Sequence, residues 1–138
     1  MKTVDEQLET MDIFRGLSKS EIKKIRRLMT PTTVRAGKQF ITEGDPGREA
    51  FLVLDGRATV RKGSKILATV GPGDFLGEMS VLTGDHRTAS VTADTDLEVE
   101  VLSKREFSSL LDDQPRIARK LLLGVIQRLR ELEPGIVG

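Results

Sequence analysis

The sequence predicts a mainly β protein of the sandwich, barrel or jelly-roll type, with helices at both ends. Nine of the 13 glycines fall between residues 32 and 102, and the segments that they separate have the length of strands. Apolar residues recur at helical spacing before and after this region. Because 138 residues suit one domain, we expect a single domain over residues 1–138.

The N-terminal part is expected to hold helices over about residues 4–30. Its main helix lies within residues 17–29, where isoleucine, leucine and methionine recur at helical spacing. Ser18 and Glu21 have the spacing of a capping box, in which each side chain accepts a hydrogen bond from the backbone N–H of the other residue. Pro31 is expected to stop the helix, because proline cannot continue the backbone hydrogen bonds.

The central region, about residues 31–102, is expected to form the β core. Residues 50–54, AFLVL, are apolar throughout and predict a buried strand. Residues 97–102 alternate leucine and valine with Glu98 and Glu100, which is the pattern of a strand with one buried and one solvent-facing side. Further strands are expected at residues 57–61, 65–70 and 88–93, with a turn at residues 71–74.

Two helices are expected to close the chain over about residues 103–132. Ser103 and Glu106 repeat the capping-box spacing, which predicts the start of the first of these helices. The second helix follows Pro115, and its apolar side chains lie on one stripe. That stripe consists of Ile117, Leu121, Val125 and Leu129.

The composition argues against several classes of function. The formal net charge of +1 is too balanced to predict nucleic-acid binding, and the absence of cysteine removes disulfides and thiolate chemistry. His86 is the single histidine, so neither a metal centre nor a catalytic histidine cluster is expected. The longest apolar run, residues 121–126, is too short to span a bilayer. We therefore expect a cytoplasmic protein without membrane contact, enzymatic activity, cofactor or metal.

The segment from Gly77 to Ser90 carries the candidate chemistry. A helical turn at residues 78–83 would leave its first N–H groups free for an anion, and Gly77 would let a ligand approach the backbone. Arg87 adds a planar fork of donors that suits phosphate oxygens. Glu78 can accept hydrogen bonds from hydroxyl groups such as a ribose 2′-OH. It can equally pair with Arg87, and the spacing alone favours this ordinary surface ion pair.

Residues 73–93, GDFLGEMSVLTGDHRTASVTA, resemble the phosphate-binding cassette of the cyclic nucleotide-binding domain family. Residues 36–60 are similar to the first sheet of that family, and residues 102–122 resemble its closing helix pair. The resemblance covers about residues 10–131, nearly the whole chain. It implies a β jelly roll, or double-stranded β-helix, with N-terminal helices and two C-terminal helices. It also implies a non-enzymatic sensor of a cyclic nucleotide, whose C-terminal helices are repositioned when the ligand binds.

The resemblance assigns a ligand site residue by residue. It implies that Glu78 binds the ribose 2′-OH and that Arg87 binds the exocyclic phosphate oxygens. The implied caps of the site are the backbone amides of Gly77, Met79, Thr88 and Ala89. Threonine after the arginine is frequent in members selective for cyclic GMP, but it also occurs in members that prefer cyclic AMP. Cyclic AMP is the expected ligand, and cyclic GMP is the alternative.

The last helix is expected to cover the nucleotide base with apolar side chains, for which Leu122, Leu123 and Ile126 are the candidates. Besides the nucleotide, the partners considered are an effector protein or domain and a second copy of the chain. Direct nucleic-acid binding is not expected, because no helix-turn-helix follows residue 131. The alternative function is a scaffold or dimerisation module of the same fold, which binds a protein without nucleotide.

Overall fold

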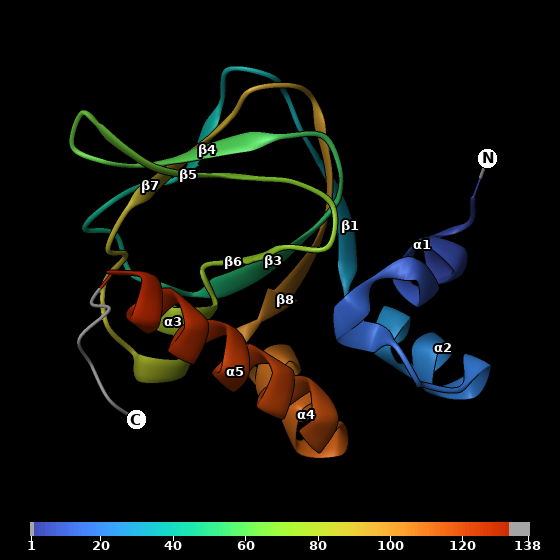
Figure 1. Cartoon of the computed structure of the whole chain (residues 1–138). Coiled ribbons are helices and arrows are strands. Elements are labelled where there is room, and N and C mark those ends of the chain that lie inside the picture. The colour runs from blue at the N-terminus through green and yellow to red at the C-terminus, as the bar shows by residue number, and fades with distance from the viewer. Residues whose placement is uncertain (1, 133–138) are drawn as a thin grey trace.

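Two four-stranded antiparallel sheets form the centre of the computed structural model, which describes residues 2–132 (Figure 1). One sheet has the order β1-β8-β3-β6 and the other β2-β7-β4-β5. The strands are β1 Thr30–Val34, β2 Gln39–Ile41, β3 Glu49–Asp55, β4 Ala58–Lys62, β5 Lys65–Val70, β6 Phe75–Leu76, β7 Ser90–Ala93 and β8 Leu97–Ser103. The predicted jelly roll with flanking helices is confirmed.

The helices begin where the sequence predicts them. They are α1 Val4–Thr10, α2 Lys19–Leu28, α3 Glu78–Thr83, α4 Lys104–Asp113 and α5 Pro115–Leu132, with a 3-10 turn η1 at Asp12–Phe14. Both capping boxes form, with Ser18 N–H donating to Glu21 Oε1 at 2.9 Å and Ser103 N–H donating to Glu106 Oε1 at 2.8 Å. Helix α2 ends at Leu28, before Pro31, which lies in β1 at the edge of its sheet.

Strand β3 is buried on both faces, as its apolar sequence predicts. Ala50, Leu52 and Leu54 belong to a core cluster that includes side chains of α1, α2 and α4. Phe51 and Val53 point the other way, into the interior of the roll between the two sheets. One strand therefore supports two cores, one beneath the helices and one within the roll.

Strand β8 departs from its prediction at Glu100. Glu98 is exposed, but Glu100 is only 2% exposed, although both were expected to face solvent. The outer face of β8 also carries Leu102, which belongs to the same core cluster as Ile22 and Ile25 of α2. This cluster includes side chains of α1 and α2, and the alternation of side chains along one strand does not show which elements pack against either of its faces.

Helix α5 lies across the molecule beside the roll and contacts the N-terminal segment (Figure 1). Arg116 Nη1 donates to the Gly16 carbonyl at 3.2 Å, and Lys120 Nζ donates to the Asp12 carbonyl. Leu129, part of the predicted apolar stripe, is among the side chains outside the described set, and residues 133–138 lie outside the described chain. None of the helices within residues 2–132 is both long and apolar enough to cross a membrane.

Candidate functional site

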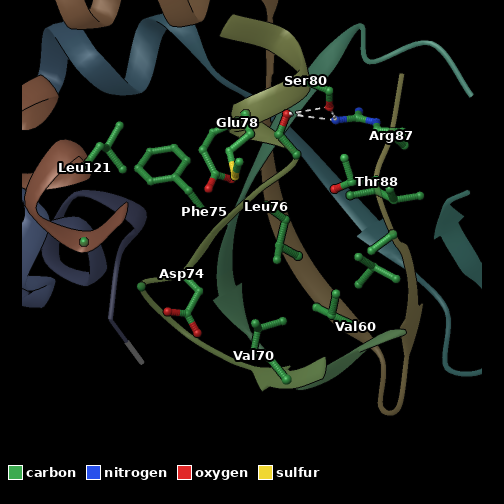
Figure 2. Close-up of a pocket in the computed structure, with 18 of the residues that line it drawn as sticks. Val60, Val70, Asp74, Phe75, Leu76, Glu78, Ser80, Arg87, Thr88 and Leu121 are labelled. Atoms are coloured by element: carbon green, nitrogen blue, oxygen red, sulfur yellow. Dashed lines mark hydrogen bonds between the residues drawn. The ribbon is translucent and has the colours of Figure 1, made fainter. Parts of the chain in front are cut away.

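A cavity of about 480 Å³ opens between the roll and α5. Its walls come from the β6–α3 junction, from β4 and β5, from the segment before β7, and from α5. Figure 2 shows Glu78, Ser80 and Arg87 at one end of this cavity. Val60 and Val70 lie at the other end. The cavity therefore carries the charges of Glu78 and Arg87 at one end, and the other end is lined mostly by apolar side chains of β4 and β5, with Asp74 beside them.

The polar end is built around Gly77, which caps α3 in the left-handed conformation with φ of 74°. A Cβ at this position would collide with Nη1 of Arg87. Glycine is thus required twice, for its backbone conformation and for the close approach of the guanidinium. The helical turn predicted at residues 78–83 is confirmed as α3.

The Arg87 side chain is 9% exposed and is held by three hydrogen bonds. Its Nη1 donates to the Gly77 carbonyl at 2.8 Å and to Ser80 Oγ at 2.9 Å, and its Nη2 donates to the Glu49 carbonyl at 2.7 Å. A guanidinium has five N–H groups, so these bonds leave Nε–H and one Nη2–H unused by the described residues. Two donors are what a bidentate contact with a phosphate requires.

The loop before β3 fixes the Arg87 backbone. Arg87 N–H donates to the Asp45 carbonyl at 2.8 Å, and Gly44 N–H donates to the Arg87 carbonyl at 2.9 Å. Pro46 and His86 form an isolated antiparallel bridge beside these bonds. Residues 44–49 therefore hold both the backbone and the side chain of Arg87, which restricts the position of its guanidinium.

The polar end keeps its charges partly out of water. Burial lowers the pKa of the Arg87 guanidinium below its ordinary value, and three carboxylates oppose that shift. They are Glu49, Glu78 and Asp45. Arginine stays protonated at physiological pH even when its pKa is lowered, so the cavity offers a permanent positive charge beside the buried carboxylate of Glu78.

The structure brings the predicted cassette residues together. The cavity lining includes all six, namely Gly77, Glu78, Met79, Arg87, Thr88 and Ala89. The predicted simple surface ion pair is not what forms, because both Glu78 and Arg87 are buried. A carboxylate and a guanidinium at one end of a cavity suit a ligand that carries both hydroxyl groups and an anionic group.

The predicted cover over the base is placed differently. Leu122 and Leu123 are 59% and 54% exposed, Ile126 is also exposed, and none of the three lines the cavity. Helix α5 instead contributes Leu121, together with Lys120 and Gly124. In this position the stripe of Ile117 and Leu121 faces the rest of the molecule. Successive residues of a helix are rotated by about 100°, so Leu122 and Leu123 lie on other faces of α5.

Sequence reasoning missed Ser80 and the loop at residues 44–49. Ser80 is 7% exposed and contacts the guanidinium of Arg87 directly. Its only signal in the sequence is a small polar residue within the apolar turn Met-Ser-Val-Leu. The loop acts through backbone groups, namely the Gly44 N–H and the carbonyls of Asp45 and Glu49. Almost any residue type supplies such groups, so the sequence does not mark the loop as a partner of Arg87.

A metal has no evident place in the described part of the chain, where no group of three or more histidine, aspartate or glutamate side chains is close enough to hold one.

A second hollow, of about 580 Å³, adjoins the first between η1, the turn at residues 71–74 and Lys120. The two share Ile13, Gly73, Asp74 and Lys120 in their walls.

Comparison with known proteins shows the family to which the chain is similar. The family model for the cyclic nucleotide-binding domain matches residues 31–114. The chain is 27% identical over 132 residues to a CRP-like cAMP-activated global transcriptional regulator of Mycobacterium tuberculosis, covering 92% of this chain and 59% of the relative. It is 34% identical over 128 residues to a cAMP-dependent protein kinase regulatory subunit of Hypocrea atroviridis, covering 92% of this chain and 28% of that relative.

A solved structure of a longer protein contains the same fold. The Thermus thermophilus catabolite activator protein superposes with a TM-score of 0.80 at 30% identity, covering 88% of this chain and 59% of that chain. The present chain thus spans less than two thirds of the length of these proteins. The family match over residues 31–114 spans the strands of the roll, the segment from Gly77 to Ala89, and α4.

Proposed function

Because this chain belongs to the cyclic nucleotide-binding domain family, we propose that it is a sensor that binds cyclic AMP in the cavity between the roll and α5. The observation that carries the proposal is the buried Arg87 guanidinium, which keeps two N–H donors beside the cavity after its three bonds to the protein. The role is regulatory binding, and we expect no catalytic activity.

The two buried charged side chains bind different groups of the ligand. Arg87 binds the exocyclic phosphate oxygens with its two remaining donors. Glu78 accepts a hydrogen bond from the ribose 2′-OH. Backbone amides of Gly77, Met79, Thr88 and Ala89, which line the same cavity, complete the contacts to the phosphate and sugar.

The base occupies the apolar end of the cavity. The printed names of two relatives, a cAMP-activated regulator and a cAMP-dependent kinase subunit, support cyclic AMP as the ligand. Thr88 lines the cavity, and its hydroxyl offers a guanine base a hydrogen-bond partner. Cyclic GMP is therefore the alternative ligand.

Signalling requires α5 to prefer one position when the nucleotide is bound. The helix is held by Arg116 and Lys120 in the position described. Movement of α5 over the base would bring Leu122, Leu123 and Ile126 toward the ligand as the predicted cover. A regulatory effect needs the ligand to favour one position by about 1–3 kcal/mol.

Isothermal titration of Arg87→Ala tests the proposal. Loss of the guanidinium removes a charged, bidentate partner of the phosphate, so cyclic AMP affinity should fall by more than about tenfold. Arg105→Ala is the matched control, because Arg105 is exposed on α4 and does not line the cavity. Equal affinity of the wild type and Arg87→Ala would overturn the assignment.

A protein-binding module is the second candidate, and the exposed apolar side chains of α5 favour it. They are Leu122, Leu123 and Ile126. An effector protein or a second copy of the chain would be the partner. If the protein binds no nucleotide but its apparent size in size-exclusion chromatography increases with concentration, that result would support this candidate.

Localisation in the cytoplasm and the lack of direct nucleic-acid contact remain predictions.

A further inference from the structure

Ser80 is a buried hydroxyl to which the family resemblance gives no role in this chain. It lies in the first turn of α3, two residues after Glu78, and is 7% exposed. A buried hydroxyl is unfavourable unless it has hydrogen-bond partners. The partners of Ser80 are therefore informative about why a serine stands within an apolar helical turn.

The Ser80 hydroxyl lies between the guanidinium and the backbone of the cassette. It accepts a hydrogen bond from Arg87 Nη1 at 2.9 Å and lies 3.4 Å from the Gly77 carbonyl, to which it donates (Figure 2). The same Nη1 donates to the Gly77 carbonyl. Both hydrogens of Nη1 are therefore bonded, and the guanidinium cannot turn in its plane without breaking one of the bonds.

The Ser80 side chain is itself confined. A Cβ on Gly47 would lie 2.5 Å from both Cβ and Oγ of Ser80, so the loop at residues 44–49 passes directly against it. That loop also binds the backbone of Arg87 through Asp45 and Gly44. The serine is thus packed between the segment that fixes the Arg87 backbone and the guanidinium at the end of the Arg87 side chain.

We propose that Ser80 is a positioning residue that fixes the Arg87 guanidinium with Nε–H and one Nη2–H left for the ligand. An alanine would leave Nη1 with the Gly77 carbonyl alone, and the plane of the guanidinium would gain freedom. A ligand would then have to order the side chain as it binds, which lowers affinity. The affinity part of this inference rests on the proposed function, whereas the ordering of Arg87 does not.

The first experiment measures Arg87 without any ligand. In the ¹⁵N spectrum of the arginine side chains, with Arg87 assigned from an Arg87→Lys variant, hindered rotation of the guanidinium should be seen in the wild type. Ser80→Ala should show faster rotation. Thr83→Ala is the control, because Thr83 is on the same helix and bonds to the Met79 carbonyl, not to Arg87. Unchanged rotation in Ser80→Ala would overturn the inference.

The second experiment titrates cyclic AMP into the same variants. Loss of one hydrogen bond to a charged group should weaken binding by about tenfold in Ser80→Ala, by less in Ser80→Cys, whose sulfur is a weak acceptor, and not at all in Thr83→Ala. Equal weakening in Thr83→Ala would show that α3 packing, not Arg87, is responsible. If the wild type shows hindered rotation but no nucleotide binding, the proposed function fails and the positioning role stands.

Discussion

At the scale of single residues, the buried charged side chains of Arg87 and Glu100 have different surroundings. Arg87 is surrounded by carbonyl and hydroxyl acceptors. Glu100 has an oxygen, Oε2, without a hydrogen-bond partner among the described residues. Burial raises the pKa of the Glu100 carboxyl above its ordinary value of 4.5, and the positive charge of Arg26 opposes the rise. Arg26 itself pairs with Asp5 at 2.5 Å.

Glu100→Gln should therefore stabilise the protein near neutral pH. A raised pKa means that the folded state holds the proton more tightly than the unfolded state, so stability is lost as the pH rises through the folded pKa. Removing the charge should increase the free energy of unfolding at pH 7 by about 1 kcal/mol. Urea unfolding measured from pH 3.5 to pH 8 checks this.

The test is how the difference in free energy of unfolding between Glu100→Gln and the wild type changes with pH. The advantage of Glu100→Gln should nearly vanish below about pH 4, where the wild-type carboxyl is protonated in both states. Glu98→Gln is the control, since Glu98 lies on the same strand but is exposed. A Glu100→Gln variant that is less stable than the wild type at pH 7 would show that the carboxylate is ionised and well solvated.

At the scale of elements, α5 is tied to the N-terminal segment by side chains that reach backbone carbonyls. Lys120 donates to Asp12, and Arg116 donates to Gly16. Gly16 has φ of 89°, and a Cβ there would lie 2.8 Å from Arg116 Nη1. Lys120 also lines both hollows. The position of α5 beside the cavity therefore depends on a segment 100 to 108 residues away in sequence.

Replacing Lys120 and Arg116 together by methionine should loosen α5 without unfolding the roll. Hydrogen bonds from charged groups contribute about 1 kcal/mol or more each, so amide exchange in α5 should become at least several-fold faster, while β3 and β8 stay protected. Arg119→Met is the control, because Arg119 is exposed on the same helix. Equal exchange in the double variant and in Arg119→Met would mean that apolar packing alone holds α5.

At the scale of the whole molecule, two cores meet at β3 and β8, and the cavity lies where the roll faces α5. One core joins the helices to the outer face of a sheet, and the other fills the roll. A ligand in the cavity would contact the cassette, β4, β5 and α5 at once. Binding should therefore stabilise the folded chain as a unit.

Thermal unfolding with nucleotides tests this expectation. A ligand present at 100 times its dissociation constant adds about 2.7 kcal/mol to the stability of the state that binds it, which should raise Tm by several degrees. Cyclic AMP should give the largest shift and AMP, which lacks the cyclic phosphate, a smaller one. A larger shift with cyclic GMP would reverse the proposed base preference, and no shift with any nucleotide would favour the protein-binding candidate.

Features that depend on neighbours along the chain could be predicted from the residues alone. The capping boxes at Ser18 and Ser103 join residues three apart, so their hydrogen bonds form wherever the helix forms. The apolar run in β3 predicted a strand with two buried faces. The cassette was predicted because Gly77, Glu78 and Arg87 lie within one short segment, and its resemblance to a family indicated the purpose of that segment.

Which faces of the elements are covered, and by which other elements, depends on the folded arrangement and could not be predicted from local sequence. Glu100 has the same alternating pattern as Glu98, but Glu100 is buried and senses the charge of Arg26 on α2, whereas Glu98 stays exposed. Leu121, not Leu122, lines the cavity. Ser80 meets Arg87 across seven residues of chain. In each case the partner comes from another element, and periodicity shows which residues share a face but not what packs against that face.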